Sequence, residues 1–236
     1  DDKTNVARRA SPGLTEVRQL LFASILLADE LSDLRAQGKA QGAFNLAPAP
    51  GGADDDALAA ALLRLREGSS PLGVDAERAG SYRYSQRAYL VQVYRRGAPV
   101  LLLDPVGIED FSGLAQVLAG EEWVMQAAHN DLECLAEIAL VPTRLFDTEL
   151  AAQLLGLPKV GLASLVESHL GYEMRKGHGQ ADWSARPLRR SWLEYAVLDV
   201  TVLPDLQDAL LEDLTDAGKT EWARQEFAHQ IRPRPS

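Results

Sequence analysis

The sequence predicts an α/β domain built around a mixed β-sheet, and two patterns support this prediction. Between residues 71 and 104, three short apolar segments follow one another with polar or glycine-containing segments between them, which is typical of antiparallel strands. From residue 121 onward, short apolar segments alternate with longer amphipathic ones, as strands and helices do in α/β domains. The 236 residues, of which 46% are hydrophobic and 25% charged, fit one medium domain or one domain with an appendage.

The first 45 residues are predicted to form an N-terminal extension of that domain. Leucines are spaced between charged residues over 14–37, which is the pattern of an amphipathic helix of several turns. Residues 42–56 are rich in glycine, proline and alanine and indicate a linker. We therefore predict an extension with an extra N-terminal helix, a main domain and a tail, at residues 1–45, 46–230 and 231–236 respectively.

The main domain is predicted to begin with a helix and a series of strands. Residues 57–68 are rich in alanine and leucine, as helices are, and end at a glycine. A fourth strand at 121–128 is followed by a helix over 130–140, for which Asn130 is the expected N-cap. The three preceding strands are predicted at 71–77, 87–96 and 99–104.

Helices dominate the remainder of the predicted domain. Pro204 is expected to kink or break the longest of them, because proline lacks the backbone N–H that a helix interior uses. In order, the predicted elements are a short strand and a helix at 145–156, a helix at 161–171, a polar loop at 172–188, a helix at 190–214 and a last helix at 220–230.

The composition excludes some classes of protein. A net charge of −10 is unlike that of proteins that coat nucleic acids, but it is compatible with an enzyme that holds metal ions with carboxylates. The longest apolar segment is interrupted by Asp29 and Glu30 and is too short to span a bilayer, and no secretory signal pattern is seen. The single cysteine, Cys134, cannot form an internal disulfide and fits a reducing compartment. We therefore expect a cytoplasmic protein without a membrane partner.

Asp75 and Glu77 are the first candidate site residues. They are two residues apart on a predicted strand, so both side chains leave the same face. A buried, ionised pair would carry a large desolvation cost, whereas a divalent cation would use both carboxylates as oxygen ligands. When the segment is considered alone, a solvated strand end explains the pair equally well.

Further candidates follow the fourth strand and lie on the long helix. Asp131 lies in the first turn of a predicted helix, where the helix dipole favours an acid, so capping alone would explain it. Tyr195 and Asp199 are four residues apart and therefore share a helix face. An amphipathic helix with a buried tyrosine and an exposed aspartate is the alternative for this pair.

Taken together, these residues resemble a known family. The segments "GVDAERA", "HNDLECL" and "YAVLDVTVL" are similar to the three motifs of ribonuclease D, within the tyrosine-type branch of the DEDD 3′–5′ exonucleases. The related histidine-type branch has histidine where this chain has Glu194. The segments "FDTELAAQLLG", "VGLASLV" and "KGHGQADWSARPL" also resemble ribonuclease D, and the similarity extends from about Asp54 to Phe227.

The resemblance implies a fold, a cofactor and residue roles. It implies an RNase H-like (DnaQ-like exonuclease) mixed sheet flanked by helices. Asp75, Glu77, Asp131 and Asp199 would hold two divalent cations, Mg²⁺ or Mn²⁺, and Tyr195 would orient or deprotonate the attacking water.

Several basic or polar residues are candidates for binding the substrate. Gln92 would hydrogen-bond within the site or face a neighbouring strand, and the basic residues would hold phosphates or form part of a solvated loop. Trp183 would stack on a base or pack the loop in which it lies, and we favour packing. The candidates are Gln92, Lys176, Arg186, Arg189 and Arg190.

The leading hypothesis is a 3′–5′ exoribonuclease that acts on the 3′ ends of single-stranded or structured RNA precursors such as tRNA. A DNA-directed 3′–5′ exonuclease would use the same acids, and the choice depends on contacts to the 2′-hydroxyl. A non-catalytic RNA-binding scaffold of the same fold is the third hypothesis, although such a protein would not need all five site residues.

Overall fold

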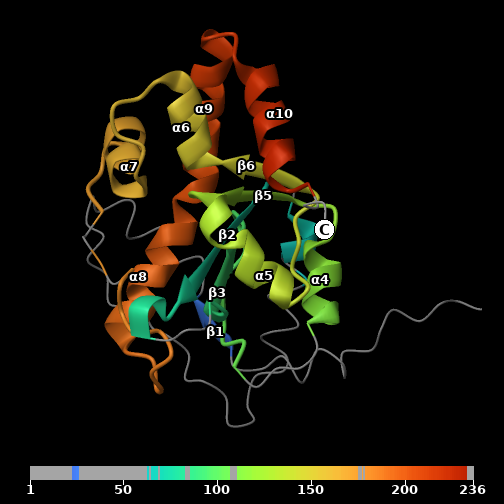
Figure 1. Ribbon diagram of the computed structural model, residues 1–236, viewed down its shortest axis with the longest axis vertical. Coiled ribbons are helices and arrows are strands. Elements are labelled where there is room, and N and C mark those ends of the chain that lie inside the picture. Colours follow the sequence, from blue (N-terminus) through green and yellow to red (C-terminus); the bar gives the residue numbers. More distant parts are fainter. Residues whose placement is uncertain are drawn as a thin grey trace, which may run out of the picture.

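The computed structural model describes residues 23–26, 63, 65–68, 70–82, 86–106, 111–174, 177 and 179–232. Its centre is a six-stranded mixed sheet with the strand order β1-β4-β3-β2-β5-β6 (Figure 1). The strands are β1 (Ala23–Leu26), β2 (Leu72–Arg78), β3 (Ala88–Tyr94), β4 (Val100–Leu103), β5 (Glu122–Met125) and β6 (Arg144–Asp147).

The two halves of the sheet differ in strand direction. β2, β3 and β4 are antiparallel neighbours, which confirms the predicted strand series. β5 pairs with β2 in parallel, and β6 pairs with β5 in parallel. Every residue of β3 is buried, because both faces of this central strand are covered. β2 therefore lies where the antiparallel and parallel halves meet: its first residues pair with β5, and Gly73 and the residues after it pair with β3.

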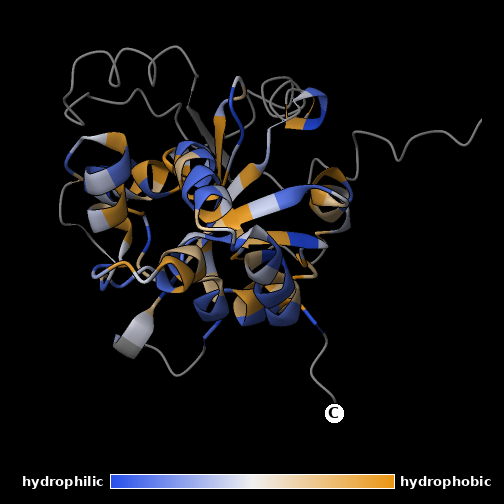
Figure 2. Ribbon diagram, turned by 90° about the horizontal axis from the view of Figure 1, so that it is seen from above, coloured by the Kyte–Doolittle hydropathy of each residue, from blue (hydrophilic) through white to orange (hydrophobic). Residues whose placement is uncertain are grey.

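The sheet is flanked by helices that carry hydrophobic and hydrophilic residues on different sides (Figure 2). α8 packs against β2, β3 and β4, while α9 packs against α6, α7 and β5, and α10 covers β6. The helices are α4 (Ser112–Leu118), α5 (Leu132–Glu137), α6 (Thr148–Leu155), α7 (Leu162–Leu170), α8 (Arg190–Thr201), α9 (Leu203–Asp216) and α10 (Thr220–Gln230). Among the described helices, none has both the length and the apolar character needed to cross a membrane.

The break predicted at Pro204 is confirmed. α8 ends at Thr201 and α9 begins at Leu203, with Pro204 in its first turn, where the missing N–H has no helical partner to lose. The end of α8 lies unusually close to β2. A Cβ atom added at Gly73 would lie 2.5 Å from the carbonyl oxygen of Val200. Glycine at this position therefore permits the approach that brings α8 to the sheet.

Three expectations about local structure differ from the structure. Residues 23–26 of the predicted N-terminal helix form strand β1, which pairs with β4, so helix is wrong for these four residues. Asn130 is not a helix N-cap, because it lies in the 3₁₀ helix η3 (Ala128–Asn130) and Asp131 takes the N-cap of α5. Helix α4 was not expected. The rest of the predicted N-terminal helix, the linker at 42–56 and residues 233–236 of the tail lie outside the described residues.

Candidate active site

β2 supplies two acids to one face of the sheet. Asp75 is half-buried and Glu77 is 7% exposed. Residues two apart on a strand share a face, so the two carboxylates point the same way. β3 pairs with β2 at both acids, Asp75 opposite Gln92 and Glu77 opposite Leu90, while β5 pairs with the start of β2 at Leu72 and Gly73, which gives the carboxylates a rigid support.

α8 brings a third acid to the same place. Asp199 lies on the helix that packs across β2 and is only 7% exposed. One carboxylate oxygen from each of Asp75, Glu77 and Asp199 lies within 4.8 Å of the other two. The expectation of an exposed aspartate on an amphipathic helix is therefore excluded.

Asp131 completes the acidic cluster from the other side of β2. It lies directly after η3 at the end of the β5 connection and is 6% exposed. A hydrogen bond joins its carboxyl group to that of Asp75, with Asp131 as the donor while it is protonated. The Asp131 side chain makes no capping bond to the N-terminus of α5, so capping does not explain its position.

Burial raises the pKa of every acid in this cluster. The pKa of Asp75 rises to about 6 and that of Asp131 to about 8, in both cases chiefly through desolvation. The pKa values of Glu77 and Asp199 lie well above their usual range, because burial and the negative charge of Asp75 both oppose ionisation. Four such groups cannot all be ionised unless positive charge is added. A buried set of hard oxygen donors therefore suits Mg²⁺ or Mn²⁺.

Tyr195 lies next to the acids and keeps its proton. Burial raises its pKa, and the carboxylate of Asp199 raises it further through its charge and a hydrogen bond. The ring is packed against the loop before α8, because a Cβ atom at Gly177 would lie 1.9 Å from Cδ2 of Tyr195. With its pKa raised, the phenol is suited to donating a hydrogen bond and poorly suited to acting as a base.

Two residues that contact or support the site were not singled out from the sequence. Arg78, the last residue of β2, places its Nε 3.4 Å from Oδ1 of Asp131. Asp147 is 1% exposed, and its carboxylate accepts bonds from the N–H groups of Ala127 and Ala128, which lead into η3 and hence to Asp131. A basic residue directly after the D-x-E motif was the available signal for Arg78. Asp147 is also the N-cap of α6, where its carboxylate accepts bonds from the N–H groups of Glu149 and Leu150, but its bonds to Ala127 and Ala128 join distant segments and have no local signal.

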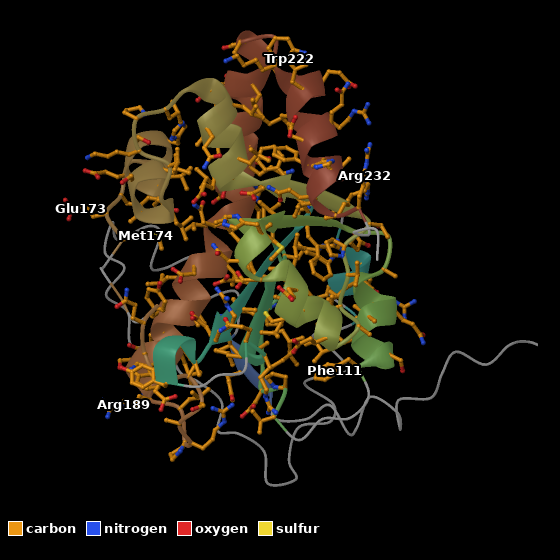
Figure 3. The ribbon with its side chains drawn as sticks, viewed as in Figure 1. Phe111, Glu173, Met174, Arg189, Trp222 and Arg232 are labelled. Atoms are coloured by element: carbon orange, nitrogen blue, oxygen red, sulfur yellow. The ribbon has the colours of Figure 1, made fainter. Side chains whose placement is uncertain are left out.

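The structure places the predicted substrate-binding residues in different environments. Gln92 lies opposite Asp75 on β3 and is fully buried, with no hydrogen-bond partner for either side-chain polar atom. Lys176 lies outside the described residues. Arg189 and Arg190 are exposed at the start of α8, and Arg189 lies at the opposite end of the molecule from Trp222 (Figure 3). Arg190 is paired with Glu194 at 2.9 Å.

The guanidinium of Arg186 donates all its hydrogen bonds to acceptors within the protein. Its Nε and Nη2 donate to the two carboxylate oxygens of Asp104, at 2.6 and 2.7 Å. Nη1 donates to the carbonyl oxygens of Trp183 and Ala185, and Nη2 also donates to that of Tyr89. These five bonds use all five N–H groups of the guanidinium, which leaves none for a phosphate. The expectation that Arg186 binds phosphate is not supported by this arrangement.

Trp183 is fully buried, as the packing interpretation predicted. Its ring lies 5.5 Å from the ring of Trp192, on the first turn of α8. The loop before α8 is therefore anchored by a tryptophan pair and by Arg186. Cys134 is buried on α5, and burial raises the pKa of its thiol to about 12.

Comparison with known proteins agrees with this geometry. A family described as 3′–5′ exonuclease matches residues 52–215. Ribonuclease D of Zymomonas mobilis is 34% identical over 186 residues, covering 76% of this chain and 47% of that protein. The solved structure of Escherichia coli RNase D is similar with a TM-score of 0.66 at 30% identity, covering 75% of this chain and 48% of that one. A protein from Bifidobacterium adolescentis gives a TM-score of 0.71 at 38% identity, covering 76% and 45%.

The mixed sheet with its flanking helices is thus the DnaQ-like exonuclease fold that the sequence predicted. The chain belongs to the 3′–5′ exonuclease family, and the resemblance to ribonuclease D is confirmed. It spans about half the length of the ribonucleases D that it matches.

Proposed function

We propose that this chain is a metal-dependent 3′–5′ exoribonuclease that removes nucleotides from the 3′ ends of RNA. The observation that carries the proposal is the convergence of four carboxylates, three buried and one half-buried, and Tyr195 from β2, the β5 connection and α8. Membership of the 3′–5′ exonuclease family supports the reaction class. The acids are poorly suited to any structural role, because burial opposes the ionisation of all four.

Each side chain has a role in that reaction. Asp75, Glu77, Asp131 and Asp199 hold two divalent cations, Mg²⁺ or Mn²⁺, which supply positive charge for activating water and for stabilising the leaving 3′ oxygen. The Tyr195 hydroxyl keeps its proton, donates a hydrogen bond through it to Asp199, and orients the attacking water by accepting a hydrogen bond from that water. Asp147 holds the backbone turn that positions Asp131.

Similarity to ribonuclease D favours RNA over DNA as the substrate. The Escherichia coli relative, at 30% identity, is described as an exoribonuclease involved in structured RNA processing. We extend that role to this chain and propose structured precursors such as tRNA as its substrates in the cytoplasm. DNA cleavage and binding without cleavage are the alternative outcomes of the test.

The test compares matched RNA and DNA oligomers labelled at the 5′ end and incubated with Mg²⁺. We expect RNA to shorten one nucleotide at a time from its 3′ end and DNA to shorten more slowly. Asp75→Asn is expected to abolish shortening. Asp208→Asn, the same change at an exposed acid on α9, should leave it intact. Faster DNA shortening would reassign the substrate, and RNA binding without shortening in the parent would refute the enzyme.

A further inference from the structure

Arg78 has an unusual position for a strand residue. The register between β2 and β3 shifts between Glu77 and Arg78, and such irregularities change the direction of a side chain. The guanidinium lies beside the acidic cluster, with Nε 3.4 Å from Oδ1 of Asp131, and Nη1 donates to Oε1 of Gln86 at 3.2 Å. The side chain is 31% exposed, so it extends from the acids to the solvent-facing edge of the site.

Arg78 is also the source of positive charge for the cluster. Its Nε pairs with a carboxylate oxygen of Asp131, and it directly follows Glu77 on β2. The guanidinium therefore partly replaces, in the protein alone, the charge that a divalent cation would supply.

A divalent cation and this guanidinium would compete for Asp131. Two positive groups that share one carboxylate repel each other strongly in a partly buried site. Cation binding at Asp131 would thus weaken the ion pair and free the guanidinium for another anion. A planar guanidinium that reaches the solvent-facing edge of a nuclease site is suited to a phosphate, which it can bind with two parallel hydrogen bonds.

We propose that Arg78 is a substrate-binding residue that pairs with Asp131 when the site holds no cation and contacts an RNA phosphate when cations occupy the acids. This inference rests on the proposed function. The proposal gives the Arg78 side chain two opposite effects: it weakens cation binding and strengthens RNA binding. A residue with a purely structural role would affect both in the same direction.

The test measures Mn²⁺ binding and RNA binding separately. In Arg78→Gln without RNA, calorimetric titration should show Mn²⁺ binding several-fold tighter than in the parent, because the competing charge is gone. With Ca²⁺ in place of Mg²⁺, fluorescence anisotropy should show single-stranded RNA binding about tenfold weaker. The slope of log affinity against log salt should fall by about 0.7, as expected for the loss of one phosphate contact.

Two further variants sharpen the result. Arg78→Lys keeps the charge but not the planar fork, so it should return Mn²⁺ affinity to the parent value and restore RNA affinity only in part. Arg224→Gln, the same change at an exposed residue of α10, should alter neither affinity. Melting temperature of the metal-free protein reports on folding for all three.

The possible results separate this inference from the proposed function. Weaker binding of both Mn²⁺ and RNA in Arg78→Gln would assign Arg78 a structural role and overturn the inference. Unchanged RNA affinity and salt slope, in a parent that binds and shortens RNA, would overturn it while leaving the proposed function intact. A parent that binds no RNA would overturn both.

Discussion

Burial makes ionisation of Asp75, Glu77, Asp131 and Asp199 costly, and the protein offsets this cost only in part. Arg78 and the hydrogen bond between Asp131 and Asp75 favour some of the charged forms, but desolvation is the largest influence on all four pKa values. Acids in such surroundings are poised to gain from an added cation. The positions of individual residues around them therefore decide how well the site works.

Gly177 is one such residue, because its backbone lies against the Tyr195 ring. A methyl group there would lie 1.9 Å from Cδ2, so Gly177→Ala must displace the ring or the loop. We expect kcat for RNA shortening to fall roughly 10- to 100-fold with little change in melting temperature, since misplacing a catalytic group by about 1 Å has effects of that size. Gly161→Ala, where an added methyl group meets no atom within 4 Å, is the matched control. Parent-like kcat in Gly177→Ala would show that the ring position is unimportant.

At the level of elements, the site depends on how closely α8 approaches β2. Asp199 reaches Asp75 and Glu77 because the last turn of α8 lies against a glycine of the strand. The loop before α8 is attached to the sheet by Arg186, which bonds to Tyr89 of β3 and to Asp104, and to α8 by the contact between the Trp183 and Trp192 rings. Helix and strand are thus joined at both ends of α8.

Gly73→Ala tests the approach at the end of α8. The new Cβ would lie 2.5 Å from the carbonyl oxygen of Val200, which belongs to the backbone and cannot move by changing a rotamer. We expect the free energy of unfolding to fall by about 1–3 kcal/mol, as for other overpacked cores. Displacement of Asp199 should also weaken Mn²⁺ binding in calorimetric titration. Unchanged stability with unchanged Mn²⁺ affinity would contradict the close packing.

Arg186→Gln tests the attachment of the loop. Loss of the paired bonds to Asp104 and of the bonds to backbone carbonyls should lower the free energy of unfolding by about 1–3 kcal/mol in a urea titration. Arg190→Gln removes an exposed ion pair on the same helix and should cost less than about 0.5 kcal/mol. A phosphate-binding role would instead leave the stability of Arg186→Gln unchanged and reduce the salt dependence of RNA binding.

The sequence was informative where the signal lies within one element. A spacing of two residues on β2 predicted that Asp75 and Glu77 share a face, and a spacing of four on α8 predicted the same for Tyr195 and Asp199. Asp131 was a candidate because it follows a predicted strand. Roles that depend on distant partners could not be predicted in this way. Arg186 bonds to Asp104 and Tyr89, and β1 forms through pairing with β4, although leucine spacing around it favours helix.

For the whole molecule, the acidic cluster links folding to metal binding. Folding places four acids where their ionisation is unfavourable. The free energy of unfolding of the metal-free protein is therefore lower at neutral pH, where these acids are ionised in the unfolded chain, than at acidic pH. A cation that binds only the folded protein with its acids ionised raises the free energy of unfolding, because binding shifts the equilibrium toward that state. Stability, pH and metal concentration are therefore expected to vary together.

The sign of the pH effect follows from the raised pKa values. Asp75 and Asp131 titrate near their ordinary value of 3.8 in the unfolded chain but at about 6 and about 8 in the folded protein. As pH rises through this range, the unfolded chain has already released protons that the folded protein still holds. Increasing pH therefore favours unfolding, and the melting temperature of the EDTA-treated protein should fall between about pH 5 and about pH 8.

Added Mg²⁺ should have the opposite dependence on pH. Protons compete with the cation for the same carboxylates, so the rise in melting temperature on adding excess Mg²⁺ should be larger at about pH 8 than at about pH 5. Asp131→Asn removes a carboxyl group whose pKa is raised to about 8, so it should flatten the metal-free pH profile and reduce the effect of Mg²⁺. Asp208→Asn, at an acid with 64% of its side chain exposed, should change neither. A Mg²⁺ effect of equal size at both pH values would show that these acids do not hold the cation, because binding to them must displace their protons.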